Sequence, residues 1–148
     1  MDLIIVACHA IFRPGHTAPG LAELDSSLEG GFPGEAPLYR DHARAGVLRA
    51  AGNPESRLYF SGGQTKSKLP GRSEGQSYWE VARDHAWWGH PETASRAFVE
   101  GFARDSFENL RFPLAQFHHE TGHLPAHITF IGWSFKAKRL HLHRQALN

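Results

Sequence analysis

Four short apolar runs alternate with longer stretches that carry helix signals, and this order constrains the fold of the 148-residue chain more than any other feature. Residues 3–8 and 126–131 are the clearest runs, and residues 57–60 and 96–100 are shorter ones. Continuous apolar runs of this length are typical of strands that are buried on both faces of a sheet. Strands that alternate with helices predict a mostly parallel sheet of about four strands, with right-handed crossovers. The predicted fold class is a Rossmann-like three-layer α/β sandwich.

Helices are expected over residues 38–51, 73–88, 106–121 and 136–147. The second begins at Ser73, and Gln76 follows three residues later. This is a capping-box spacing, which satisfies two free amide donors. Tyr78, Val81 and Ala82 are expected to form the buried stripe of this helix.

The chain is expected to form a single domain over residues 1–148, because its composition does not shift along the sequence. Residues 13–37 are rich in Gly and Pro and predict a long loop without regular structure. Loops of this length are usually functional or mobile.

Charge and cysteine content exclude several classes of protein. Lys and Arg number 16 against 15 Asp and Glu, so the net charge of +1 indicates neither a nucleic-acid surface nor a patch for acidic membranes. The run at residues 3–8 is too short to span a bilayer and lacks the basic flank of a signal peptide. Cys8 is the single cysteine, so no internal disulfide can form, and a buried thiol in a reducing compartment is expected. We therefore expect a cytoplasmic protein that binds neither nucleic acid nor membrane.

Ser61, Gly62, Gly63 and Gln64 directly follow the second predicted strand. They are expected at the carboxyl edge of the sheet, where open α/β sheets bind ligands. Two residues without side chains would let backbone amides point at a bound anion, to which Gln64 adds a donor. The alternative is a tight turn that needs two glycines for its backbone alone.

Glu100, Ser106, Glu108 and Asn109 lie around the expected start of the third helix. The helix dipole explains Glu108 in part. Asn109 has poor helix propensity, so its amide is best explained by a hydrogen bond to a neighbouring loop or a ligand. We expect this cluster to form one wall of a pocket, with helix capping as the alternative.

Four further residues are candidates for the same site. His9 follows the first strand and is a candidate general base or ligand contact. Glu74 lies in the first turn of its helix, where a carboxylate is also favoured without any function. Lys136 and Arg139 are three residues apart on one helix, so they share a face and could clamp an anionic substrate.

Residues 119–123 match the HExxH pattern, whose zinc chemistry needs both imidazoles on one face of a continuous helix. Gly122 argues against that continuity and is expected to cap a helix C-terminus in the left-handed conformation. No metal ligand is therefore predicted. The chain contains neither a Walker loop, nor GxGxxG, nor a GxSxG elbow.

The order of these motifs resembles the domain of unknown function 218 family, and more closely its fungal branch, over nearly the whole chain. The resemblance is carried by Ser61-Gly62-Gly63, Ser73-Glu74, Glu100-x-x-Ala103-x-x-Ser106-x-Glu108-Asn109 and Gly132-x-x-x-Lys136-x-x-Arg139. The wider family tends to have serine, threonine and histidine where this chain has Ala103, Ser106 and Lys136. Family members continue with a further strand and tail, so this chain is expected to be short at its C-terminus. Its sheet would then leave an edge open to a partner, including a second copy.

Two classes of function follow from these residues and the resemblance. In the first, the protein is an enzyme that acts on an anionic or phosphorylated small molecule by hydrolysis or group transfer. The glycine segment with Lys136 and Arg139 would hold the anion, and His9, Glu74 or Glu108 would move protons or orient water. In the second, the same pocket binds a nucleotide or S-adenosylmethionine-like ligand without turnover. A zinc protein built on residues 119–123 is the third and weakest alternative, and no cofactor is indicated.

Overall fold

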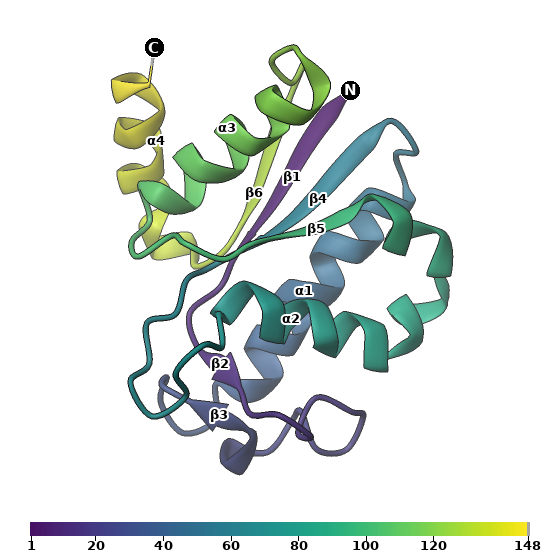
Figure 1. The fold of residues 1–148 in the computed structure, drawn as a ribbon, viewed down its shortest axis with the longest axis vertical. Helices are drawn as coiled ribbons and strands as arrows, with labels where there is room; N and C mark the ends of the chain where they lie inside the picture. The colour runs from purple at the N-terminus through teal and green to yellow at the C-terminus, as the bar shows by residue number, and fades with distance from the viewer. Residues whose placement is uncertain (148) are drawn as a thin grey trace.

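The computed structural model describes residues 1–147 and contains a four-stranded, all-parallel sheet with helices on both faces (Figure 1). The strand order is β5-β4-β1-β6. These strands are β1 (Asp2–Ala7), β4 (Ser56–Ser61), β5 (Ala97–Glu100) and β6 (Ile128–Ile131). One face is covered by α1 (Ala36–Ala51) and α2 (Glu74–Asp84), and the other by α3 (Glu108–Thr121) and α4 (Ala137–Ala146). The predicted three-layer α/β fold is confirmed.

Strand β1 lies inside the sheet and pairs with two neighbours in parallel register. Its pairing with β4 extends from Asp2 opposite Ser56 to Ala7 opposite Ser61. Because all four strands run the same way, their carboxyl ends meet at one edge of the sheet. The segments that leave this edge build the candidate site.

Alternate residues of the strands supply two cores, one on each face. Leu3, Ile5 and Tyr59 pack with residues of α3, including Phe117. The larger core lies under α1 and α2 and contains Cys8, which is buried as expected. Apolar burial on both faces explains why the strand sequences are continuously apolar rather than alternating.

The start of α2 follows the sequence prediction in part. Ser73 is its N-cap, and the N–H of Gln76 donates to Ser73 Oγ at 3.0 Å. The Gln76 side chain donates to Glu80 instead, so only one half of the expected capping box forms. Tyr78, Val81 and Ala82 are fully buried, as predicted.

Helix α2 ends at Asp84, whereas the sequence predicted a helix to residue 88. A 3-10 segment η2 (Ala86–Gly89) follows, in which Ala86, Trp87 and Trp88 have φ values of 52°, 53° and 48°. A right-handed helix cannot continue through such residues. The ring of Trp87 is buried in the α1–α2 core, so packing decides the end of the helix.

The loop predicted over residues 13–37 is partly ordered into regular structure, which corrects that expectation. Strand β2 (Ile11–Phe12) pairs antiparallel with β3 (Leu28–Glu29), which follows the 3-10 turn η1 (Asp25–Ser27). Helix α1 begins at Ala36, two residues before the expected start, with Pro37 in its first turn. Proline is tolerated there because the first helical N–H groups have no partner within the helix.

Two further 3-10 segments connect the remaining elements, η3 (Pro91–Arg96) before β5 and η4 (Ser134–Lys136) before α4. Gly122 ends α3 with φ 78°, which confirms the predicted left-handed cap. Among the helices of residues 1–147, none has the length and apolar character that crossing a bilayer requires.

Candidate functional site

A polar cavity of about 220 Å³ lies where the segments after β1, β4, β5 and β6 meet the first turn of α2. Five of the predicted site residues line it, namely His9, Glu74, Ser106, Asn109 and Lys136. It is completed by Cys8, Thr65, Lys66, Ala103, Arg104 and Asp105. The structure thus brings together residues from five separate segments of the chain at the edge where the sequence predicted a site.

Glu74 is the buried acid of this cavity. Its side chain is 8% exposed and accepts a hydrogen bond from Thr65 Oγ1 at 2.6 Å. Burial raises the pKa of the Glu74 carboxyl, and the Thr65 bond and the charges of Lys66 and Lys136 oppose this rise in part. A carboxyl with a raised pKa can exchange a proton nearer neutral pH than an exposed one.

Two lysines provide positive charge around Glu74. Lys66 Nζ lies 3.8 Å from Glu74 Oε1. Lys136 also lines the cavity, and burial, followed by the charge of Arg139, lowers the pKa of its ammonium group. Arg139 is exposed and does not line the cavity, so it acts on the cavity through its charge on Lys136.

His9 lies between the cavity and a cluster of aromatic rings. Its ring centroid is 5.9 Å from that of Tyr39 and 6.1 Å from that of Trp133, and its Nε2 is buried without a hydrogen-bond partner among the described residues. Burial, then the charges of Lys136, His42 and Lys66, lower the pKa of His9 to about 3. His9 is therefore neutral at pH 7 and fits a hydrogen-bonding contact better than a strong general base.

The two glycines after β4 do not present free amides, which corrects the expectation that they bind an anion. The N–H of Gly62 donates to the carbonyl of Glu100 at 2.9 Å, and that of Gly63 to the carbonyl of Ala103 at 2.7 Å. A Cβ at Gly62 would lie 2.6 Å from Glu74 Oε2, and one at Gly63 would lie 2.7 Å from the carbonyl oxygen of Ala103. The glycines are required for close packing behind the cavity, the alternative that the sequence left open.

Ser61, the last residue of β4, belongs to a buried polar network rather than to the cavity wall. Its Oγ lies 2.6 Å from Glu100 Oε2 and 3.0 Å from Asn109 Oδ1. Glu100 Oε1 also accepts from the backbone N–H groups of Phe102 and Ala103. The network therefore fixes the turn after β5 and the start of α3. The Asn109 amide forms a side-chain hydrogen bond, but with Ser61 of β4 rather than with the loop or ligand that the sequence predicted.

Glu108 lies at the start of α3 but outside the cavity lining. Its Oε2 accepts from the backbone N–H of Arg104 at 2.7 Å, and its Oε1 accepts from Arg104 Nη2 at 2.7 Å. Hydrogen bonds from Arg104 hold the pKa of this carboxyl below its usual range. Its hydrogen bonds with Arg104, just before the helix, thus account for Glu108 without a ligand. Gln64 is exposed and does not line the cavity either.

The HExxH segment is divided by the end of α3. His119 lies in the last turn of the helix, whereas His123 follows the Gly122 cap. Between them, Glu120 accepts hydrogen bonds from Arg57 and Tyr59. Within residues 1–147 no group of three His, Cys, Asp or Glu side chains is arranged to hold a metal ion.

Sequence reasoning missed the aromatic wall beside the cavity. A second, more open cavity of about 510 Å³ shares His9 and Lys136 with the first and is lined by Phe32, Tyr39, Trp133 and Phe135, among others. Phe32 and Phe135 are 76% and 74% exposed. The only signal in the sequence is the pair of aromatic residues Trp133 and Phe135 directly after the fourth predicted strand. Phe32 and Tyr39 lie far from them in the sequence, so no local pattern links the four residues.

No family model matches the sequence, and no curated protein or solved structure is significantly similar to it. The resemblance to the domain of unknown function 218 family therefore stays a prediction.

Proposed function

We propose that the protein is an enzyme that hydrolyses, or transfers a group from, a small anionic or phosphorylated molecule in the cavity at the sheet edge. The observation that carries this proposal is the buried Glu74 carboxyl, with its raised pKa, between Lys66 and Lys136. A buried acid with a raised pKa in a cleft, next to groups that bind anions, is typical of a catalytic site.

Each lining group has a role in this proposal. Lys66 and Lys136 bind the anionic group of the substrate and offset the charge that develops on it in the transition state. Glu74 accepts a proton from the attacking water or hydroxyl and returns it to the oxygen of the leaving group when the bond to that oxygen breaks. Ser106 and Asn109 also line the cavity and orient the substrate.

The test compares substitutions inside and outside the cavity. Purified protein is assayed against a panel of nucleotides, sugar phosphates and p-nitrophenyl phosphate, with phosphate release and native mass spectrometry as readouts. Glu74→Gln should abolish turnover while ligand binding is kept, and Lys66→Ala should weaken binding. Lys68→Ala is the matched control, because Lys68 is 81% exposed and does not line this cavity.

Turnover by Glu74→Gln at the wild-type rate, for any compound that the wild-type protein turns over, would contradict the proposal. Loss of turnover in Glu108→Gln alone would transfer the acid–base role to Glu108. Both acids occupy the first turn of a helix, where the helix dipole favours a carboxylate whatever its function. Because only Glu74 lines the cavity, a loss of activity in Glu74→Gln alone would come from its place in the cavity and not from its place in the helix.

A second candidate function is non-catalytic binding of a nucleotide or an S-adenosylmethionine-like ligand. The aromatic wall next to Lys136 favours it, because a flat ring can stack on Trp133 or Phe135 while an anionic group reaches the lysine. Under this alternative, Trp133→Ala weakens binding, and Glu74→Gln changes affinity alone because wild-type protein turns nothing over.

A further inference from the structure

Strand β6 is an edge strand, and one side of its backbone pairs with no strand of the described residues. The N–H of Leu3 donates to the carbonyl of His127 at 2.9 Å, and Leu3 lies opposite Ile128 in the register. In a parallel ladder with this register, the N–H and C=O groups of Ile128 and Phe130 point away from β1. Such unpaired groups form a template on which another extended chain can pair.

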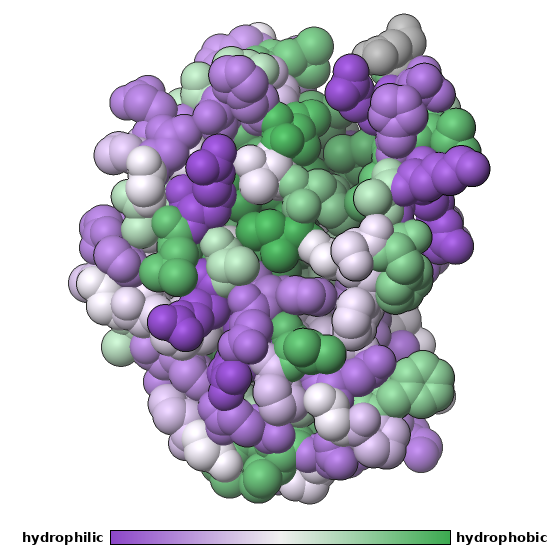
Figure 2. Space-filling view, turned by 180° about the vertical axis from the view of Figure 1, so that it is seen from behind, coloured by the Kyte–Doolittle hydropathy of each residue, from purple (hydrophilic) through white to green (hydrophobic). Residues whose placement is uncertain are grey.

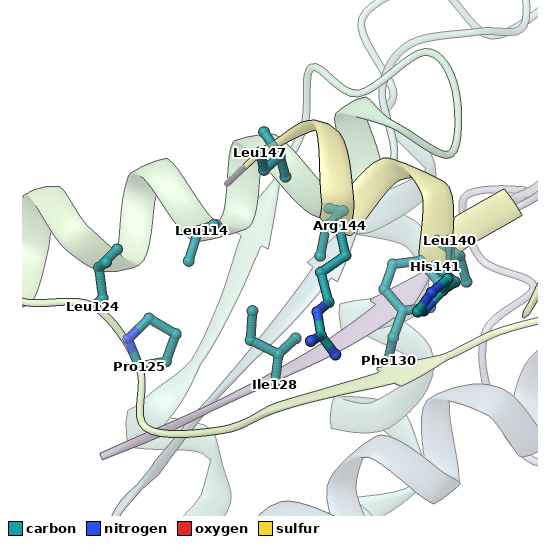
Figure 3. A pocket seen from close by; sticks show the side chains of 10 residues that line it. Leu114, Leu124, Pro125, Ile128, Phe130, Leu140, His141, Arg144 and Leu147 are labelled. Carbon is teal, nitrogen blue, oxygen red and sulfur yellow. The ribbon is translucent and has the colours of Figure 1, made fainter.

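An apolar groove of about 410 Å³ lies on the α3–α4 side of this edge. It is lined by Leu110, Leu114, Leu124, Pro125, Ile128, Phe130, Leu140, His141, Arg144 and Leu147. Figure 3 shows these side chains on α3, α4, β6 and the turn before β6, with the guanidinium of Arg144 reaching across toward Ile128. Seen from behind in Figure 2, apolar side chains gather in a hollow beside the hydrophilic side chains of α4. Leu124 and Ile128 remain 67% and 41% exposed, so side chains within residues 1–147 do not fill the groove.

The segment that contains β6 and α4 carries formal charge of one sign only. Residues 121–148 contain no Asp or Glu, although the chain has 15 of them. The four cations of this segment are Lys136, Lys138, Arg139 and Arg144, and none forms an ion pair within the described residues. A partner that fills the groove must therefore bring apolar side chains for its lining and acidic side chains for α4.

We propose that β6 and the groove beside it bind an extended polypeptide segment of another protein, rich in alternating apolar and acidic residues, as a fifth strand of the sheet. Backbone hydrogen bonds to Ile128 and Phe130 would supply affinity, and alternate side chains would enter the groove and reach Arg144. The charge argues against a second copy as the occupant, because two copies paired at β6 would bring two acid-free, cationic α4 helices together.

The experiment selects peptides from a displayed random library on the full-length protein, and then measures synthetic versions by calorimetry. The expected peptides alternate apolar residues with Asp or Glu. Arg144→Glu should weaken their binding about tenfold or more, because it replaces attraction by repulsion. Lys138→Glu is the control, with the same charge change on the same helix but outside the groove lining, and it should change affinity much less.

A second pair of variants tests the backbone contacts. Ile128→Pro removes an N–H that makes no bond to β1, whereas Ile128→Ala trims the side chain and keeps that N–H. Binding should fall further in the proline variant, provided that both variants keep the wild-type circular dichroism spectrum. Hydrogen exchange should show new protection at the Ile128 and Phe130 amides when peptide is bound.

Four outcomes would overturn the proposal. The first is a selection that enriches no peptide, or only peptides without acidic residues. The second is peptide affinity that Arg144→Glu leaves unchanged. The third is a dimeric protein whose β6 amides are already protected without peptide, which would make a second copy the occupant. The fourth is a groove that binds an apolar small molecule such as decanol, while peptides bind without protecting the β6 amides from hydrogen exchange. The groove would then be a small-molecule site and not a site for a fifth strand.

Discussion

Gly46 provides a sharp test of how closely α1 packs on the sheet. It lies within α1, and a Cβ at this position would be 2.5 Å from Val6 Cγ2 and 3.1 Å from Leu58 Cδ1. Two effects of Gly46→Ala oppose each other. Higher helix propensity would stabilise the protein by about 1 kcal/mol. Overpacking would destabilise it by about 1–3 kcal/mol, because the branched Val6 side chain has few alternative rotamers.

We expect overpacking to exceed the gain in propensity and Gly46→Ala to destabilise the fold by about 1 kcal/mol, a fall in melting temperature of about 2–4 °C for a domain of this size. Ala45→Gly, at an exposed position of the same helix, measures the propensity difference alone. Thermal and urea denaturation followed by circular dichroism would give both values. Val6→Ala makes room for the new methyl group, so the double variant should be more stable than the sum of the single changes predicts. If Gly46→Ala were more stable than wild type by the full propensity gain of about 1 kcal/mol, overpacking against Val6 would be absent and the reasoning refuted.

Three further predictions concern other parts of the chain. Ala86→Gly should stabilise the protein by up to about 1 kcal/mol, because Ala86 is exposed and has φ 52°; an unchanged or lower melting temperature would contradict the left-handed turn. Ser73→Ala removes the cap hydrogen bond to Gln76 and should cost about 1 kcal/mol in urea denaturation, whereas Ser95→Ala at an exposed position should cost little. Glu74 has its pKa raised from 4.5 by burial, so its contribution to stability is present below that pH and lost as pH rises through the folded-state pKa. The stability of Glu74→Gln relative to wild type should therefore rise between acid and neutral pH, and a constant difference between the two proteins would contradict the buried acid.

The same packing connects stability with the site. Helix α1 carries Tyr39 and His42, whose ring centroids lie 5.9 Å and 6.3 Å from that of His9. A change in the spacing between α1 and β1 would therefore move the aromatic wall of the candidate site. The buried Glu74 is a comparable case, because a charged carboxylate in a low-dielectric cavity lowers the stability of the fold at neutral pH.

The fold could be predicted from local sequence patterns. Apolar runs such as residues 3–8 identify strands because both faces of a parallel sheet are buried. Ser73 and Gly122 identify helix ends because capping depends on the local backbone. The same patterns placed His9, Glu74 and Lys136 near one edge, because parallel strands end together there.

Tertiary structure decided which of these side chains share a cavity. Glu74 and Glu108 occupy similar positions in helix first turns, but Thr65 and burial enclose the first, whereas Arg104 binds the second outside the cavity. Gly62 and Gly63 could have presented free amides, yet the carbonyls of Glu100, at the end of β5, and Ala103, in the turn after it, occupy them. The groove beside β6 is equally absent from any local pattern. Spacing along the chain determines strands, helix ends and the direction of each segment, whereas burial, hydrogen-bond partners and cavities depend on segments that meet only when the chain folds.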